Sequence, residues 1–321
     1  AYLAGGGRFI DTARGYGTSE IWVGKALKAS GLRPDEVVVC SKSGTLHPPC
    51  TRADLEVSRF CLQRDWIDVY TVHVPPAESE ALDRILDAYC QFKAEGLIRH
   101  VGLSCRNIGV NQEPDEVRSW FRDPRVEVIQ FPCSIVSPEV AVLLAEAAAA
   151  GKGVVVRGTV ASGALDDRVL PGHRFTDTAN DWRASVPEAD MERVIALVQE
   201  MKARFVKPPY TCVAQLSQAW VLAQPGVSTI IAGGGTPDEV KASLATDAVP
   251  PLPAADAAEI LRLARQIAPL LDRRKRKPAP SEKAARALAQ AATPKAGAKK
   301  PAKKAAKKPV KTTTAKRAGR R

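Results

Sequence analysis

The sequence lacks any apolar run long enough to span a bilayer, which argues against an integral membrane protein. Its first residues, Ala1–Gly5, have the features of neither a signal peptide nor a transit peptide. The seven cysteines are scattered and form no Cys-x-x-Cys pair, so neither a disulfide framework nor a thiolate metal site is expected. His47-Pro-Pro-Cys50 has the spacing of half a zinc site without a second half, and we interpret it as a loop. These absences favour a cytoplasmic protein with no membrane partner and no metal.

Acidic residues are nearly absent from the C-terminal segment, although the whole chain contains 35 Asp and Glu beside 47 Lys and Arg. Residues 273–321 contain 19 Lys or Arg and one acidic residue, Glu282, so this segment carries +18. Because the whole chain carries +12, residues 1–272 carry −6. We therefore predict a globular domain at 1–272 and a basic tail at 273–321.

The predicted tail is built from Lys, Ala, Pro, Arg and Thr and has no aromatic residue. Such a composition cannot bury enough surface to offset its chain entropy, which predicts disorder. Lys299–Pro309 resembles the Lys/Ala/Pro tails of linker histones and some bacterial nucleoid proteins. Lysines spaced along an extended chain neutralise phosphates without reading bases, so we expect weak, non-specific binding of nucleic acid or another polyanion. The alternative is a solubilising appendage with no partner.

The first 272 residues alternate short apolar runs with amphipathic helical patterns, which predicts a parallel sheet covered by helices. The predicted strands are Arg8–Asp11, Val37–Lys42, Ile67–His73, His100–Ser104, Val126–Gln130, Val154–Arg157 and Ser228–Ala232. The clearest predicted helices are Ser79–Glu95, Ser137–Ala150, Pro187–Arg204, Thr211–Ala223 and 254–272. Seven such units are close to a (β/α)8 TIM barrel. We expect the chain to lack the first strand and most of the first helix of that barrel at its N-terminus.

Polar side chains stand at the carboxyl ends of the predicted strands. They are Asp11, Lys42, His73, Ser104, Gln130 and Arg157, and Gly233 opens the turn after the seventh strand. Barrel enzymes build their sites on this rim, so we expect these residues to converge on one mouth. The alternative, that strands simply end in polar residues, explains one or two of them but not an acid, an ammonium and an imidazole in succession.

One motif carries a family resemblance. The stretch Gly7–Glu20 reads Gly-Arg-Phe-Ile-Asp-Thr-Ala-Arg-Gly-Tyr-Gly-Thr-Ser-Glu, and Lys42 and His73 end the next two predicted strands. Together they resemble the aldo-keto reductase family, over about Gly5 to Pro253. The resemblance implies a nicotinamide-dependent oxidoreductase acting on the CH–OH group of donors, in which an aldehyde or ketone is reduced to an alcohol.

The resemblance assigns catalytic roles to four residues. Tyr16 is the proton donor, Lys42 modulates its pKa, Asp11 holds Lys42, and His73 orients the carbonyl oxygen. The chemistry suits these residue types, because a phenol is a weak acid at neutral pH and a neighbouring ammonium favours its ionised form. Each residue alone has a structural interpretation: a turn cap, a loop anchor, a surface lysine or a core histidine. Their joint order and spacing favour the catalytic one.

The resemblance also implies cofactor contacts. Ser104 and Gln130 match the family's nicotinamide-binding positions, Arg157 matches a position against the ring, and Cys105 stands where the family has Asn. Gly233, Gly234 and Gly235 open a predicted helix whose backbone N–H groups suit a phosphate, although a plain tight turn is the alternative.

Cofactor preference is the open part of this prediction. NADP(H) is the family expectation, but Gly235, Glu239 and Ser243 replace the usual Arg or Lys, Gln and Asn near the adenosine 2′-phosphate. NAD(H) is therefore kept as the alternative.

Two functions from different classes follow. The first is NADP(H)-dependent reduction of a small carbonyl substrate. The alternative is a catalytically impaired barrel that acts as a binding protein, tethered to nucleic acid or another polyanion by its tail. The complete set of catalytic residue types favours the first.

Overall fold

The computed structural model describes residues 1–271, so the predicted basic tail at 273–321 lies outside the described residues. The described strands are β1 (Phe9–Asp11), β2 (Val38–Ser43), β3 (Ile67–Val72), β4 (Ile98–Ser104), β5 (Val128–Pro132), β6 (Gly153–Arg157) and β7 (Thr229–Ile231). The described α-helices are α1 (Ser19–Ser30), α2 (Pro48–Leu62), α3 (Ser79–Ala94), α4 (Pro114–Phe121), α5 (Ala141–Ala149), α6 (Glu188–Phe205), α7 (Val213–Leu222), α8 (Pro237–Leu244) and α9 (Ala254–Ile267).

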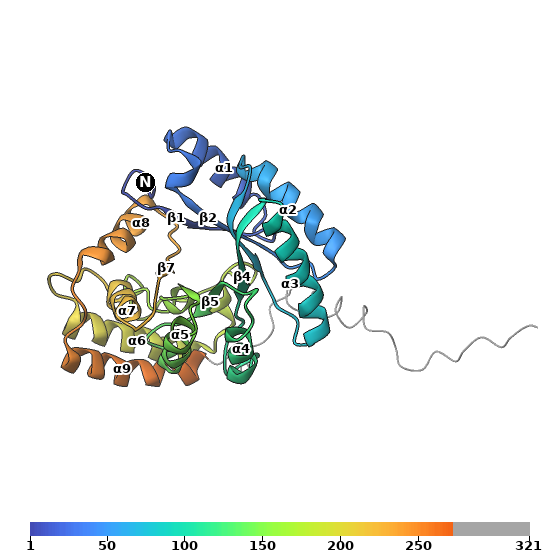
Figure 1. Ribbon diagram of the computed structural model, residues 1–321. Helices are drawn as coiled ribbons and strands as arrows, with labels where there is room; N and C mark the ends of the chain where they lie inside the picture. The colour runs from blue at the N-terminus through green and yellow to red at the C-terminus, as the bar shows by residue number, and fades with distance from the viewer. Residues whose placement is uncertain (272–321) are drawn as a thin grey trace, which may run out of the picture. The chain divides into compact units, whose positions relative to one another are not determined.

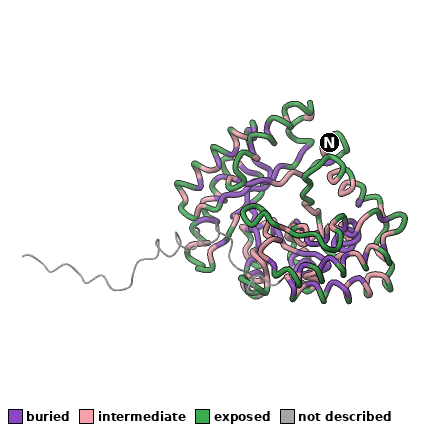
Figure 2. Tube along the Cα trace, turned by 180° about the vertical axis from the view of Figure 1, so that it is seen from behind, coloured by how far each residue is buried: buried purple, intermediate pink, exposed green. Residues whose placement is uncertain are grey.

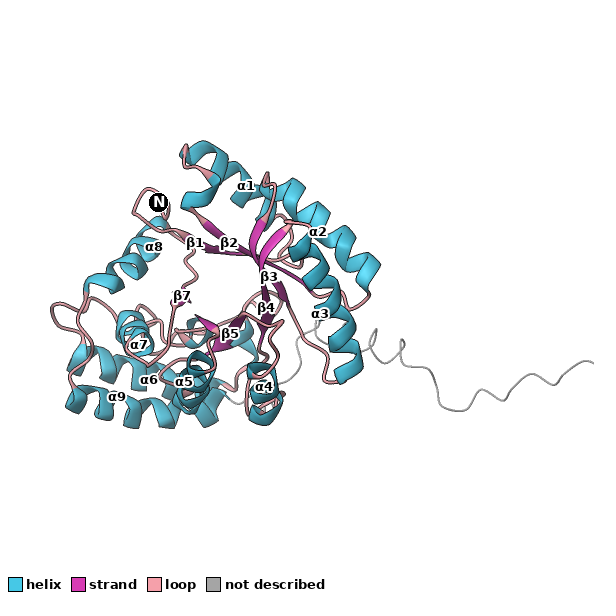
Figure 3. Ribbon diagram, in the orientation of Figure 1, coloured by secondary structure: helices cyan, strands magenta, loops and turns pink. Residues whose placement is uncertain are grey.

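The strands form one parallel sheet in the sequence order β1 to β7, and this sheet curves into a nearly closed barrel (Figure 3). Every residue of β3 is buried, as expected for a parallel strand that is covered on both faces. Within the described residues no ladder joins β1 to β7, although the two strands lie close together. The predicted α/β barrel is confirmed, with seven strands and one open seam.

The helices pack around the outside of the strands (Figure 1), and buried positions concentrate on the strands and on the helix faces toward them (Figure 2). Helix α3 buries Ile85, Leu86, Tyr89 and Phe92, which form one stripe at helical spacing. Helix α1 approaches α2 so closely that a Cβ at Gly24 would collide with the carbonyl oxygen of Cys61. No helix of the described part is both long and apolar enough to cross a bilayer.

The structure corrects some sequence boundaries. The interpretation of His47–Cys50 as a loop was wrong, because Pro48 begins α2, a position that suits proline's fixed φ and missing N–H. Strand β5 lies two residues further along than predicted and ends at Pro132, which puts Gln130 inside the strand. The last predicted helix becomes α9 followed by a 3-10 turn at Ala268–Leu271, because Pro269 cannot continue an α-helix.

The segment between β6 and α6 is the longest connection on the rim and carries only 3-10 turns. Trp182 donates through Nε1 to the carbonyl oxygen of Ser162 at 2.9 Å, and Arg183 donates to that of Gly163 at 3.2 Å. The Arg183 guanidinium also stacks 4.1 Å from the centre of the Phe175 ring. These contacts fold the segment back on itself. Helices α6 and α9 then lie side by side outside the barrel (Figure 1).

Candidate active site

A buried ion pair joins β1 to β2. Lys42 is fully buried, and its Nζ donates to Asp11 Oδ2 at 2.5 Å and to the carbonyl oxygen of Thr12 at 2.8 Å. Burial is the largest single influence and would lower the pKa of Lys42, but attraction to Asp11, together with smaller effects of Cys40 and Tyr16, outweighs it and raises that pKa above its ordinary value. The sheet therefore presents a permanent cation next to a carboxylate at its carboxyl rim.

The second carboxylate oxygen of Asp11 is bound from across the barrel. Gln130 on β5 donates through Nε2 to Asp11 Oδ1 at 2.9 Å, and Ser104 on β4 donates to Gln130 Oε1 at 3.1 Å. Because β5 and β1 are not neighbours in the sheet, this chain of hydrogen bonds crosses the barrel interior. It fixes the orientation of Asp11 from the side opposite Lys42.

Tyr16 and His73 form the outer part of the same cluster. Tyr16 lies in the turn between β1 and α1, and its hydroxyl is 3.3 Å from Nε2 of His73, which follows β3. The two rings meet edge to face with centres 5.4 Å apart, and Lys42 Nζ lies 4.9 Å from the centre of the Tyr16 ring. Tyr16 is 47% exposed, so its hydroxyl is accessible to a ligand while its ring faces a buried cation.

The electrostatics of this cluster keep His73 neutral. Its pKa is lowered first by burial and then by the positive charge of Lys42, against a smaller opposing effect of Asp11. A neutral imidazole can hold a hydrogen bond to an oxygen without adding a second positive charge beside Lys42. The cluster thus combines one cation, one carboxylate, one neutral imidazole and an accessible phenol.

The predicted cofactor residues fall into two groups. Ser104 and Gln130 belong to the network around Asp11, and Arg157 at the end of β6 donates to the carbonyl oxygen of Cys105 at 2.8 Å. Cys105 itself is 1% exposed and lies within the apolar core, where burial raises the pKa of its thiol. Its side chain therefore packs with the apolar core cluster, directly after the carboxyl end of β4.

The second group lines a cavity of about 680 Å³ that begins at Gly158, directly after Arg157. It includes the predicted residues Gly233, Gly234, Gly235, Glu239 and Ser243. Ser243 accepts a hydrogen bond from Gln218 Nε2 at 3.2 Å. A Cβ added at Gly233 would meet no atom within 4 Å, so this turn leaves open space beside the cavity. The volume is in the range of cavities that hold cofactors.

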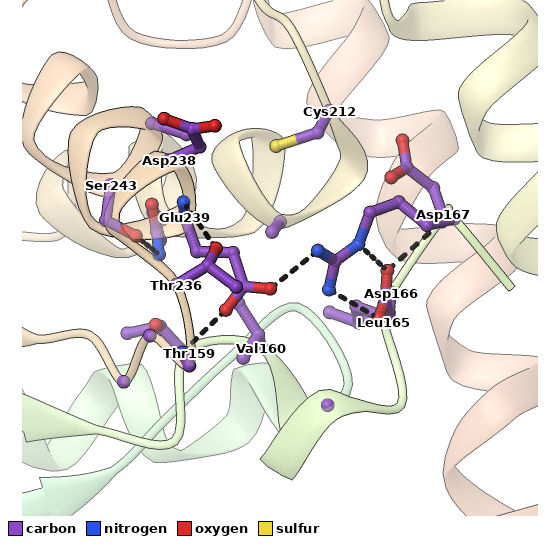
Figure 4. Close-up of a pocket in the computed structure, with 18 of the residues that line it drawn as sticks. Thr159, Val160, Leu165, Asp166, Asp167, Cys212, Thr236, Asp238, Glu239 and Ser243 are labelled. Carbon is purple, nitrogen blue, oxygen red and sulfur yellow. Dashed lines mark hydrogen bonds and ion pairs between the residues drawn. The ribbon is translucent and has the colours of Figure 1, made fainter.

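Glu239 bridges the two walls of this cavity. Its Oε2 accepts the backbone N–H of Gly235 at 2.7 Å, and its Oε1 accepts from Arg168 Nη1 at 2.6 Å. Arg168 is held in turn by Asp166 at 2.8 Å. Figure 4 labels Glu239 and Asp166, the two carboxylates that Arg168 joins. Hydrogen bonds from Arg168 and then from Gly235 lower the pKa of Glu239, so it is ionised.

The sequence analysis did not identify Arg168, because its partner Glu239 lies 71 positions further along the chain and no motif marks the pair.

The geometry accommodates a nicotinamide dinucleotide. The cavity is lined by Gly158, which follows the strand end at Arg157, and by the glycine turn, while the cluster around Tyr16 lies at the carboxyl ends of other strands on the same rim. Arg157, Gly158 and the turn Gly233–Gly235 would hold such a molecule, with the accessible Tyr16 hydroxyl left for a second ligand.

The molecule is a parallel barrel, and its carboxyl rim holds a lysine–carboxylate pair, a phenol and an imidazole. Enzymes of the barrel class place their active sites at this rim. Comparison with known proteins identifies the class further. A family model described as "Aldo/keto reductase family" matches residues 1–265. The chain belongs to the aldo/keto reductase family of oxidoreductases.

The chain is also similar to individual members. It is 27% identical to an Escherichia coli protein named NADH-specific methylglyoxal reductase over 266 residues, which cover 74% of this chain and 77% of that protein. An aldo-keto reductase from Bacillus halodurans in its holo form superposes with a TM-score of 0.63 and 26% identity, over 82% of this chain and 85% of that one. A Klebsiella pneumoniae aldo/keto reductase in complex with NADP and acetate has a TM-score of 0.60 at 23% identity, over 82% of each chain, which supports the fold alone.

Proposed function

We propose that this protein reduces a small aldehyde or ketone to an alcohol with a reduced nicotinamide dinucleotide. The observation that carries the proposal is the single cluster of Tyr16, His73, Lys42 and Asp11 at the carboxyl rim. The family expectation for the cofactor is NADP(H), with NAD(H) as the alternative. One similar protein is named NADH-specific and another was solved with NADP, so both cofactors occur among similar proteins.

Tyr16 is the proton donor in this proposal. Its hydroxyl is exposed to the rim, and the neighbouring cation of Lys42 stabilises the negative charge that develops on the phenol oxygen when the proton leaves. Asp11 keeps Lys42 charged and in place, and Gln130 keeps Asp11 in place. A reduced nicotinamide supplies the hydride when it is bound.

His73 positions the substrate oxygen. Its Nε2 lies beside the Tyr16 hydroxyl, and its lowered pKa keeps the ring neutral at neutral pH. A carbonyl oxygen placed between the phenol and the imidazole would contact both groups. The oxygen is then held within reach of the proton that it receives.

The test is Tyr16→Phe. The variant keeps the ring packing but has no proton to give, so the turnover number should fall about 10²- to 10⁴-fold. The measurement is the loss of NADPH or NADH absorbance with methylglyoxal and with an aromatic aldehyde. Cofactor binding, followed by the quenching of protein fluorescence, should be unchanged because the hydroxyl is not part of the cavity lining. Equal turnover in wild type and variant would refute the role of Tyr16.

We further propose that 1–272 is the catalytic domain and that 273–321 gives weak, non-specific binding of nucleic acid or another polyanion. The support is the +18 charge of that segment beside a body of −6. Deleting 273–321 should abolish retention on a DNA column at low salt and leave turnover unchanged. Retention of the shortened protein would place polyanion binding in the barrel instead.

We also propose a cytoplasmic location. The support is the scattered cysteines of the sequence, all seven of which are free thiols in the structure.

A further inference from the structure

The charged residues around the cavity are mainly acidic. They are the carboxylates Asp166, Asp167, Asp238 and Glu239 and the cations Arg168 and Lys202. A dinucleotide brings two phosphates of its own, and a 2′-phosphate adds up to two more negative charges. The six charged side chains of the lining sum to −2, and this net charge opposes each added phosphate.

Both cations of the cavity lining already contact oxygen atoms of the protein. Arg168 contacts Asp166 at 2.8 Å and Glu239 at 2.6 Å. Lys202 donates to the carbonyl oxygen of Asp167 at 3.1 Å and lies 4.0 Å from the carboxylate of the same residue. An additional phosphate that pairs with Arg168 competes with two carboxylates of the protein for the charge of this one cation.

Glu239 occupies the backbone donor that an incoming anion would use. The glycine turn presents the N–H of Gly235 at the start of α8, and the Glu239 carboxylate accepts it at 2.7 Å. The Thr236 hydroxyl accepts the N–H of Glu239 itself at 3.3 Å, which fixes the residue in the first turn of the helix. The protein thus supplies its own anion at this position, and Arg168 holds it there.

We infer that Glu239 and Arg168 make this cavity select a dinucleotide without a 2′-phosphate, so that the protein prefers NADH to NADPH. The inference rests on the proposed function, because it concerns the cofactor of that reaction. It reverses the NADP(H) preference that the family resemblance implies. Its physical cause is the repulsion of a dianion by a fixed carboxylate, together with the loss of Arg168 as a free partner.

The experiment measures binding without catalysis. Isothermal titration calorimetry on the full chain compares ADP-ribose with 2′-phospho-ADP-ribose, which differ only in the phosphate. The wild type should bind ADP-ribose about tenfold more tightly. Glu239→Gln should remove most of this difference, because it removes the repelling charge and releases Arg168 toward the phosphate. The affinity for ADP-ribose should change less than about twofold.

Two further variants separate this mechanism from general charge removal. Asp238→Asn removes the same charge one residue away, at a side chain that is 91% exposed and pairs with Lys241 rather than Arg168. It should shift the ratio of the two affinities by less than about threefold. The double variant Glu239→Gln/Arg168→Gln should lose the gain made by Glu239→Gln, because the released cation is gone.

Two results would overturn the inference. If Glu239→Gln strengthens both ligands equally, or leaves their ratio unchanged, Glu239 does not select against the phosphate, and the dinucleotide site and the proposed reduction stand. If neither ligand binds to any form, the cavity is not a dinucleotide site, and the proposed cofactor fails together with the inference. The first result leaves the Tyr16 test unaffected, so the two failures are distinguishable.

Discussion

The site has two ends, the cluster around Tyr16 (the chemical end) and the cavity lined by Glu239 (the proposed dinucleotide end). The two ends are built in different ways. At the chemical end, Lys42 is fully buried and the Asp11 side chain is 9% exposed, and both residues belong to paired strands. At the proposed dinucleotide end, the side chains of Arg168 and Glu239 are 63% and 30% exposed, and they join the connection between β6 and α6 to helix α8. Removing one partner of a buried ion pair is costly, whereas an exposed pair contributes little to stability. The comparison teaches that the residues of the proposed reaction are tied to the stability of the barrel, while those of the proposed cofactor choice can change with little effect on it.

The largest expected effect is on the free energy of unfolding, which a substitution at the chemical end should lower much more than one at the proposed dinucleotide end. Lys42→Met leaves the Asp11 carboxylate buried beside an apolar side chain, so the free energy of unfolding should fall by about 3–5 kcal/mol. Arg168→Gln removes an exposed cation and should cost less than about 1 kcal/mol. Chemical denaturation followed by circular dichroism measures both. Similar losses for the two variants would break the comparison.

A double variant shows whether Lys42 also has a catalytic role. Asp11→Asn/Lys42→Met removes both charges and should recover much of the lost stability, because no unpaired charge is left buried. Turnover should not recover, because the cation beside Tyr16 is still missing. Recovery of turnover with stability would mean that Lys42 only supports the fold.

A smaller effect concerns pH and the chemical end. The pKa of His73 is lowered in the folded protein from its ordinary value of 6.5, so below that value the unfolded chain binds a proton that the folded chain does not. The contribution of His73 to the free energy of unfolding is therefore fully present above pH 6.5. It declines as the pH falls toward the lowered pKa. His73→Gln should therefore lose less Tm than wild type between about pH 7.5 and about pH 5.5. An identical decline in both proteins would remove His73 from the electrostatic cluster described above.

Much of the fold could be predicted because parallel strands buried on both faces are continuous apolar runs, and the residue after each run must lie at the carboxyl rim. This reasoning predicts that Asp11, Lys42 and His73 lie on the rim, and the structure brings these residues together there. It could not locate Arg168, because the long connection between β6 and α6 must fold before this residue meets Glu239 on α8. Nor could it predict that Cys105, at a position implied to contact the cofactor, is 1% exposed and packs within the apolar core cluster. Strand order predicts which end of the barrel a residue reaches, but not which way a side chain turns there.

The open seam between β1 and β7 has a consequence for catalysis. Strand β1 is only three residues long, and within the described part of the chain it has a strand ladder on one side only. The carboxylate at its end therefore depends on side-chain tethers, one from its neighbour β2 and one from the far wall of the barrel. The carboxylate that we propose for the reaction thus has two anchors although its strand is at the edge of the sheet. Loosening Gln130 would let the reaction centre drift before the barrel itself lost any strand pairing.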